Sequence, residues 1–268
     1  MVSYNALPLG EVGAKQAKLI TTKTIIMIQE KNKINPDAQS LQMAVSDSCG
    51  SLTITCEDNM ELMKRYPDKY FDLAIVDPPY GIDINKSINY SHERAEKQKK
   101  RGYKKHTHKE WDKQIPTIEY FSELFRVSRN QIVWGGNYMT EHLAPSRCWI
   151  IWDKLNPDFT AISNEMAWTS FDKKINIFKR LINIDNGFMN SDGGRIHPTQ
   201  KPVALYKWIL DKYAKQGDKI LDTHLGSGSI AIACHDYGFD LTACELDKEY
   251  FDKAMQRINN HVAQQKLF

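Results

Sequence analysis

Short apolar runs alternate along the chain with segments whose apolar residues recur at helical spacing. The runs predict strands at residues 51–55, 73–76, 131–134, 148–152, 165–171, 218–222 and 239–244. The helically spaced segments predict helices at residues 59–66, 118–127, 203–214, 229–238 and 247–263. This alternation is typical of an α/β protein with a mostly parallel sheet and helices on both faces.

The N-terminal part of the sequence does not show this alternation clearly, whereas the rest of the sequence does. Residues 1–47 show only weak helical periodicity, which Asn35-Pro36 breaks, and they predict an N-terminal arm. Residues 48–268 fit one domain with a sizeable core. Within this domain, the polar segments 84–113 and 172–196 are predicted to form a loop and a short recognition segment.

Composition narrows the class of protein. The net charge of +3 is only mildly basic, so any polyanionic partner has to be inferred from where the charges lie. Five cysteines without C-x-x-C spacing argue against a zinc site and against a disulfide framework. No apolar run is long enough to span a bilayer, and no signal-peptide layout is present. We therefore expect a cytoplasmic protein with no membrane partner and no metal.

The sequence Asp77-Pro78-Pro79-Tyr80 ends the strand predicted at 73–76. Ligands of open α/β sheets bind at the carboxyl ends of strands, where a carboxylate and an aromatic ring can hold a flat polar group. A capped strand followed by a turn explains the same four residues without any function.

Two other residues carry the same ambiguity. Asp58 follows the strand at 51–55, where it can face a ligand, cap the next helix, or do both. Lys201 precedes a helix whose first turn begins near Pro202. A cation at a helix N-terminus is unfavourable unless an anion lies there, so Lys201 predicts a nearby anion.

A glycine-rich turn follows the strand that ends at Asp222. Gly226, Ser227 and Gly228 lead directly into a helix, an arrangement that lets a nucleotide approach the backbone. Glu245 ends the next strand roughly 20 residues later, where an acidic residue commonly binds ribose hydroxyls. These features predict a dinucleotide or an adenosine-type cofactor.

The loop at 84–113 is rich in basic residues, with nine Lys and Arg between Arg94 and Lys113 and with Tyr103 and Trp111 among them. Such a segment is either a solvated charge run or a loop that contacts phosphates. Beside a candidate active site we favour phosphate contact, through the following residues: Lys99, Lys100, Arg101, Lys104 and Lys105. Phe159, in a later loop, is a candidate stacking ring, although loop aromatics more often only pack.

Three motifs stand in a characteristic order: D-P-P-Y at 77–80, H-P-T-Q-K-P at 197–202 and D-T-H-L-G-S-G-S at 222–229, with Glu245 behind them. Over about residues 51–255 the chain resembles the amino-group DNA methyltransferases of the circularly permuted β class. The resemblance implies a Rossmann-like fold in which the catalytic half precedes the cofactor half.

The same resemblance assigns roles to these residues. D-P-P-Y becomes the catalytic motif, acting on the N6 amino group of adenine in double-stranded DNA. Asp222 and the glycine turn hold S-adenosyl-L-methionine, Glu245 binds its ribose, Asp58 lies by its adenine, and Lys201 pairs with its carboxylate. The resemblance also implies a possible homodimer and a place in restriction-modification.

Several alternatives stay open at this point. Cytosine N4 needs the same acceptors, and only Asp rather than Ser at the first motif position favours adenine. A catalytically silent DNA- or nucleotide-binding protein of the same fold, or a methyltransferase acting on RNA or protein, would share many of these features. Thr223 and His224 replace the family's usual Pro-Phe pair, and the segment 172–196 is short.

Overall fold

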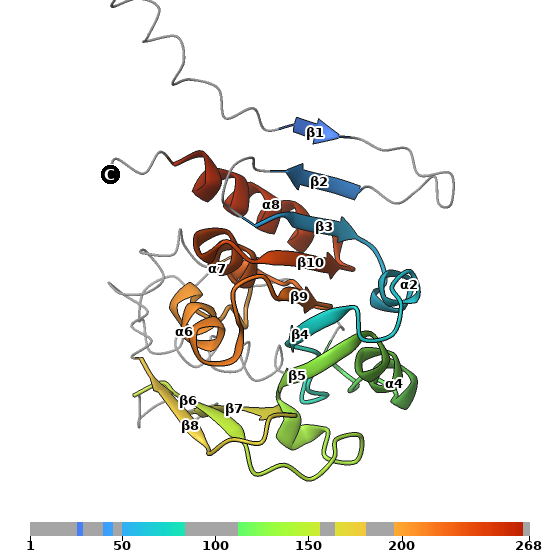
Figure 1. The fold of residues 1–268 in the computed structure, drawn as a ribbon, viewed down its shortest axis with the longest axis vertical. Coiled ribbons are helices and arrows are strands. Elements are labelled where there is room, and N and C mark those ends of the chain that lie inside the picture. Colours follow the sequence, from blue (N-terminus) through green and yellow to red (C-terminus); the bar gives the residue numbers. More distant parts are fainter. Residues whose placement is uncertain are drawn as a thin grey trace, which may run out of the picture.

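A computed structural model describes residues 50–83, 112–155, 164–180 and 196–264, together with the backbone of two strands nearer the N-terminus. The described strands form one ten-stranded sheet in the order β1-β2-β3-β10-β9-β4-β5-β7-β6-β8 (Figure 1). Its centre is parallel and consists of β3 (Leu52–Cys56), β10 (Asp240–Glu245), β9 (Lys219–Asp222), β4 (Phe71–Val76) and β5 (Ser128–Trp134).

Antiparallel pairs extend the sheet on both sides of this parallel centre. On one side lie β1 (Ile26–Ile28) and β2 (Ser40–Ala44), with β2 paired to β3. On the other side β7 (Asn164–Thr169) pairs with β5 and with β6 (Trp149–Asp153). The strand β8 (Asn176–Lys179) runs parallel to β6 at the edge.

Helices cover both faces of the sheet (Figure 1). The helices α6 (Val203–Tyr213), α7 (Ser229–Tyr237) and α8 (Lys248–Ala263) pack on one face over a first apolar cluster. The helices α2 (Asn59–Lys64) and α4 (Ile118–Val127) pack on the other face over a second cluster. Each helix buries the apolar stripe from which it was predicted, and the expected α/β fold is confirmed.

Some strands were missed. The strand β8 lies inside the polar segment 172–196, and β1 and β2 lie inside the region predicted to be an arm. In β8, Ile177 is exposed, so its side-chain pattern is not that of a buried strand. Its place in the sheet comes from backbone pairing with β6, which a side-chain pattern does not reveal.

The strand order creates a crevice at the carboxyl ends of the parallel strands. The strands β3 and β4 follow one another in the chain, yet β10 and β9 lie between them. The helix after β3 and the helix after β9 lie on opposite faces of the sheet (Figure 1). Open α/β sheets bind ligands at such a change of direction. Among the described residues, none of the helices is long and apolar enough to cross a membrane.

Candidate active site

A cavity of about 300 Å³ lies at the carboxyl ends of β3, β4, β9 and β10. Its lining includes six residues predicted from the sequence: Asp77, Pro79, Lys201, Gly226, Ser227 and Glu245. These residues come from distant parts of the chain, and the parallel strands bring them to one edge of the sheet. The other predicted residues among the described ones lie beside this lining.

The glycine turn and Glu245 form one hydrogen-bonded unit. The Gly226 amide donates to Glu245 Oε2 at 2.9 Å, and the Asp247 amide donates to Oε1 at 2.9 Å. Gly226 has a φ of 54°, a conformation that residues with a Cβ seldom adopt. Gly228, at a φ of 72°, lies so close to α8 that an added Cβ would be 2.9 Å from Ile258 Cδ1. The backbone contacts fix the Glu245 carboxylate at the cavity wall, where each oxygen retains a further lone pair.

Burial raises the pKa of both acids in this part of the site. It raises the pKa of Glu245, whereas the amides of Asp247 and Gly226 lower it. The pKa of Asp222 is raised to about 8 by burial and by the charges of Asp77 and Glu245, against the hydrogen bond from the His224 amide. Asp222 is 2% exposed and lies behind the cavity wall, next to residues that line it.

Thr223 and His224, which depart from the family pattern, take part in a polar chain. Thr223 Oγ1 lies 2.7 Å from the Tyr120 hydroxyl and 2.9 Å from His224 Nδ1, and His224 Nε2 lies 3.2 Å from Asn59 Nδ2. Burial lowers the pKa of His224 to about 4, so the ring is neutral near pH 7 and can donate through one nitrogen and accept through the other. Both residues line the cavity. Thr223 and His224 therefore stand where the family usually has Pro-Phe, and their polar groups are hydrogen-bonded there.

Asp58 is a helix cap. Its side chain accepts the Met60 amide at 2.8 Å and the Glu61 amide at 3.4 Å, which is the capping alternative left open by the sequence. Its neighbours Glu57 and Asn59 line the cavity. The assigned contact of Asp58 with the cofactor's adenine stays a prediction.

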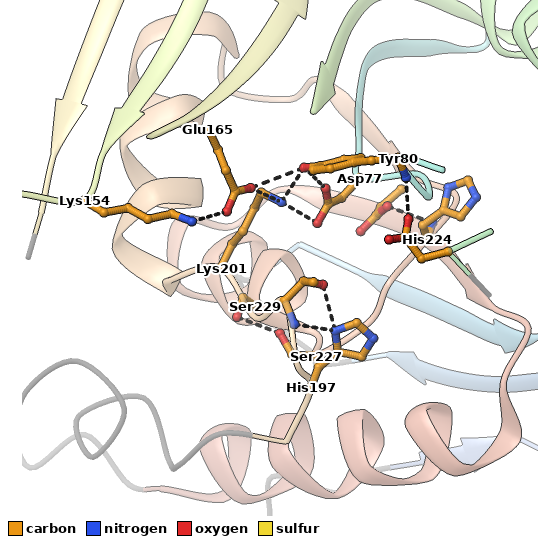
Figure 2. Close-up of polar contacts among 12 residues, drawn as sticks. Asp77, Tyr80, Lys154, Glu165, His197, Lys201, His224, Ser227 and Ser229 are labelled. Carbon is orange, nitrogen blue, oxygen red and sulfur yellow. Dashed lines mark hydrogen bonds and ion pairs between the residues drawn. The ribbon is translucent and has the colours of Figure 1, made fainter. Parts of the chain in front are cut away.

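The first residue of D-P-P-Y is the centre of a buried ionic cluster (Figure 2). Lys201 Nζ lies 2.6 Å from Asp77 Oδ2, and the Tyr80 hydroxyl donates to Asp77 Oδ1 at 2.8 Å. Burial raises the pKa of Asp77, and the charge of Glu165 raises it further, whereas the Lys201 ammonium lowers it. Lys201, 2% exposed, keeps its charge because two carboxylates face it.

Glu165 is the second anion of this cluster. Its Oε2 lies 3.0 Å from Lys201 Nζ and 3.2 Å from the Tyr80 hydroxyl, while Oε1 pairs with Lys154 Nζ at 2.5 Å. Burial opposes the charged form, but the ammonium groups of Lys201 and Lys154 outweigh it and lower the pKa of Glu165 to about 2. Anions are therefore present beside Lys201 within the chain itself, as the Asp77 and Glu165 carboxylates. The assigned contact of Lys201 with the cofactor's carboxylate stays a prediction.

The Tyr80 ring is held between two neighbours. It stacks on Tyr138 with a centroid distance of 5.4 Å and an interplanar angle of 18°. On another side Gly135 makes room for it, because a Cβ there would lie 2.2 Å from Tyr80 Cε1. Asp112 Oδ1 accepts the Tyr80 amide at 2.7 Å and fixes the backbone after Pro78 and Pro79. The aromatic partner of Tyr80 in this structure is Tyr138, which is 42% exposed.

The predicted phosphate contacts lie outside the described residues, as does Phe159. These contacts are Lys99, Lys100, Arg101, Lys104 and Lys105. The described residues contain no group of three or more His, Cys, Asp or Glu side chains placed to hold a metal ion.

Sequence reasoning missed Glu165, Lys154 and Tyr138. Glu165 starts a run of otherwise largely apolar residues, 165–171, and Lys154 follows another such run. A charged residue at the end of a buried strand was a signal that could have marked both. Tyr138 follows Gly135-Gly136-Asn137 at the end of β5, in the position relative to its strand that Tyr80 has after β4.

Known proteins are similar to this chain in fold or in sequence. The solved structure of the PvuII DNA methyltransferase, described as cytosine-N4-specific, matches with a TM-score of 0.52 at 10% identity, over 82% of this chain and 89% of that chain. This similarity shows the fold.

Two bacterial enzymes are similar in sequence. The type II methyltransferase M.HpaI of Haemophilus parainfluenzae is 21% identical over 77% of this chain and 74% of its own length. M.HinfI of Haemophilus influenzae is 25% identical over 77% of this chain and 68% of its own length. The family described as DNA methylase, with N6 and N4 amino-methyltransferases, matches residues 85–256, more than half of the chain. The chain thus belongs to the DNA methylase family and is, as its motifs predict, a DNA methyltransferase that uses S-adenosyl-L-methionine.

Proposed function

We propose that the protein methylates the N6 amino group of adenine in double-stranded DNA, with Asp77 as the acceptor of that amino group. The observation that carries this proposal is the position of Asp77: its carboxylate lies at the cavity wall and is oriented by Lys201 and Tyr80. A carboxylate held in this way can accept a hydrogen bond from an exocyclic amine facing the cavity.

The cavity has the chemistry that S-adenosyl-L-methionine needs. Glu245 offers carboxylate lone pairs to ribose hydroxyls, and the turn at Gly226 brings backbone to the cavity without a side chain. The helix α7 begins after Gly228 without a side-chain cap, so its first amides favour a negatively charged group nearby. Bound there, the cofactor supplies an electrophilic methyl group, and the residues described here hold and orient the two reactants.

The amine is a weak nucleophile because its lone pair is delocalised into the base. Hydrogen bonds from its two N–H groups to Asp77 and to the Pro78 carbonyl would favour a more tetrahedral nitrogen with its lone pair directed at the methyl group. As the methyl group transfers, positive charge develops on the nitrogen, and the Asp77 carboxylate stabilises it. Asp77 is also placed to accept the proton that the product loses.

Adenine is favoured over cytosine by the identity of residue 77. The resemblance associates Asp at this position with adenine and Ser with cytosine, and a serine here would leave Lys201 with Glu165 as its only carboxylate within the cluster. The PvuII enzyme, cytosine-N4-specific by its description, shares the fold but only 10% of its sequence.

A base inside a duplex is inaccessible, so the target has to be flipped out and held by stacking, worth about 1–3 kcal/mol for one ring. Tyr80 is the proposed stacking ring, with the base taking the place that Tyr138 has against it in this structure. The basic segment around Lys99 and Lys105 is proposed to contact phosphates. A homodimer and a cytoplasmic location stay predictions.

The proposal is tested by incubating the purified protein with methyl-labelled S-adenosyl-L-methionine and mixed duplex DNA, followed by digestion to nucleosides and mass spectrometry. We expect label in N6-methyladenine. Label in N4-methylcytosine would replace the proposed base. Absence of label from every nucleoside across many DNA sequences would favour a silent binding protein.

A further inference from the structure

The hydroxyl proton of Tyr80 can form a hydrogen bond with either of two carboxylates, Asp77 or Glu165. Lys201 uses its three N–H donors on Asp77 Oδ2 at 2.6 Å, Glu165 Oε2 at 3.0 Å and the Tyr80 hydroxyl at 3.1 Å. The Tyr80 oxygen therefore already accepts a hydrogen bond, and its own single proton can go to only one carboxylate. Asp77 Oδ1 at 2.8 Å and Glu165 Oε2 at 3.2 Å are both within reach (Figure 2).

The choice matters because the two carboxylates have different surroundings. Asp77 lines the cavity, whereas Glu165 is held behind it by Lys201 and Lys154. With the Tyr80 proton on Asp77, that carboxylate already receives hydrogen bonds on both of its oxygens, and it is a weaker acceptor for any further donor. Turning the hydroxyl toward Glu165 requires only rotation about the C–O bond, because the ring itself is fixed between Tyr138 and Gly135.

We propose that Glu165 is a positioning residue that accepts the Tyr80 hydrogen bond when the target amine binds Asp77. This inference rests on the proposed function. The amine then meets a carboxylate oxygen released from Tyr80, while the tyrosine hydroxyl stays satisfied in its buried place. Without an acceptor at residue 165, the hydroxyl keeps donating to Asp77 Oδ1 and leaves that carboxylate a weaker acceptor for the amine, or the hydroxyl is left unsatisfied.

The proposed role of Glu165 as a hydrogen-bond acceptor can be separated from its role in balancing charge by comparing two pairs of substitutions. The pair of changes Lys154→Met with Glu165→Gln removes one positive and one negative charge but keeps a carbonyl acceptor at residue 165. The pair Lys154→Met with Glu165→Met makes the same change in charge and removes the acceptor. The two proteins therefore have the same net charge and differ only at residue 165, in an amide that can accept a hydrogen bond against a thioether, with Lys201 and Asp77 intact in both.

The experiment measures single-turnover methyl transfer for both pairs, each with Tyr80 and with Tyr80→Phe. With Tyr80 present, we expect the Met pair to be about tenfold slower than the Gln pair, since one buried hydrogen-bond acceptor is lost. With Tyr80→Phe, no hydroxyl competes for Asp77, and we expect the two pairs to differ by less than about twofold.

Equal ratios in the two backgrounds, or no difference between the pairs with Tyr80 present, would overturn the proposal. Thermal unfolding and calorimetric binding of S-adenosyl-L-methionine establish that each variant is folded. If the Met pair fails to fold, Lys154→Leu with Glu165→Leu is compared with Lys154→Leu with Glu165→Gln, and the same ratios decide. A wild-type protein that labels no DNA refutes the proposed function instead, so the two failures are distinguishable.

Discussion

Changing Asp222 to Asn should make the protein more stable at alkaline pH and leave it nearly unchanged at acidic pH. Asp222 is 2% exposed, and its pKa is raised to about 8 by burial and by the charges of Asp77 and Glu245. Its Oδ1 accepts the His224 amide at 3.0 Å, a contact that the side-chain carbonyl of asparagine can keep. The substitution therefore removes the titration while retaining the hydrogen bond.

The sign of the effect follows from proton linkage. In the unfolded chain the carboxyl group has its ordinary pKa of about 3.9, so between about pH 4 and pH 8 folding of the wild-type protein takes up a proton at Asp222. The contribution of Asp222 to the free energy of unfolding falls as the pH rises through this window and is constant above it. A pKa difference of this size corresponds to an upper limit of about 6 kcal/mol. Water penetration and relaxation around the charge reduce it, and we expect about 2–3 kcal/mol between pH 5 and pH 8.

The measurement is urea unfolding of wild type and Asp222→Asn at pH 5, 6, 7 and 8, followed by tryptophan fluorescence. Titrating groups that do not interact with Asp222 cancel in the difference between the two proteins. Asp211→Asn, a change at an exposed position of α6, gives the baseline for removing a carboxylate in contact with water. A difference between wild type and Asp222→Asn that stays constant from pH 5 to pH 8 would show that Asp222 is ionised in the folded protein and would refute the reasoning.

Four further predictions concern binding and catalysis. Asp77→Asn should lower methyl transfer at least about a hundredfold in a single-turnover assay while calorimetry shows cofactor affinity within a few-fold, because the carboxylate acts on the amine; near-normal turnover would contradict the assigned role. Glu245→Gln should weaken cofactor binding about tenfold by calorimetry, since a charge-assisted hydrogen bond is worth about 1.5–3 kcal/mol and part of it remains; unchanged affinity would place the ribose elsewhere. Lys201→Met should not change how much more tightly the protein binds S-adenosyl-L-methionine than its decarboxylated analogue, because the lysine donors are used within the chain. A smaller preference for S-adenosyl-L-methionine in the variant would show that Lys201 contacts the cofactor's carboxylate. Neutralising the basic residues of the loop should flatten the salt dependence of DNA binding by up to about 0.9 log unit per lost phosphate contact, and an unchanged slope would mean that the loop is only solvated; the residues changed together are Lys99, Lys100, Arg101, Lys104 and Lys105.

The sequence predicted the central elements because their side-chain periodicity reflects burial. The helix predicted at 118–127 is observed as Ile118–Val127, and the strand predicted at 239–244 is observed as Asp240–Glu245. The edge strand β8 was missed because its side chains alternate between half-buried and exposed, without a fully buried position. At the edge of a sheet, backbone pairing determines the position of a strand more than its side-chain pattern does. Such pairing joins residues that are distant in the sequence, so the sequence pattern does not reveal it.

The same physical reason explains what could be predicted of the site. The D-P-P-Y motif and the glycine turn are local arrangements, so their residue types and spacing identify them. The partner of Lys201 is not local: Asp77 lies 124 residues earlier in the chain. Helix electrostatics indicated that Lys201 needs an anion, but only the fold, which places β9 beside β4, shows which carboxylates supply it.

Lys201 links the two halves of the enzyme. It lines the cavity from the segment before α6, and its ammonium group lies 2.6 Å from the Asp77 carboxylate at the end of β4. Because all three of its donors are used by Asp77, Glu165 and Tyr80, we expect the cofactor's carboxylate to bind other donors, such as the amides at the uncapped start of α7. Lys201 thus connects the part of the cavity wall before α6 directly to the Asp77 carboxylate, although the two residues are 124 positions apart in the chain.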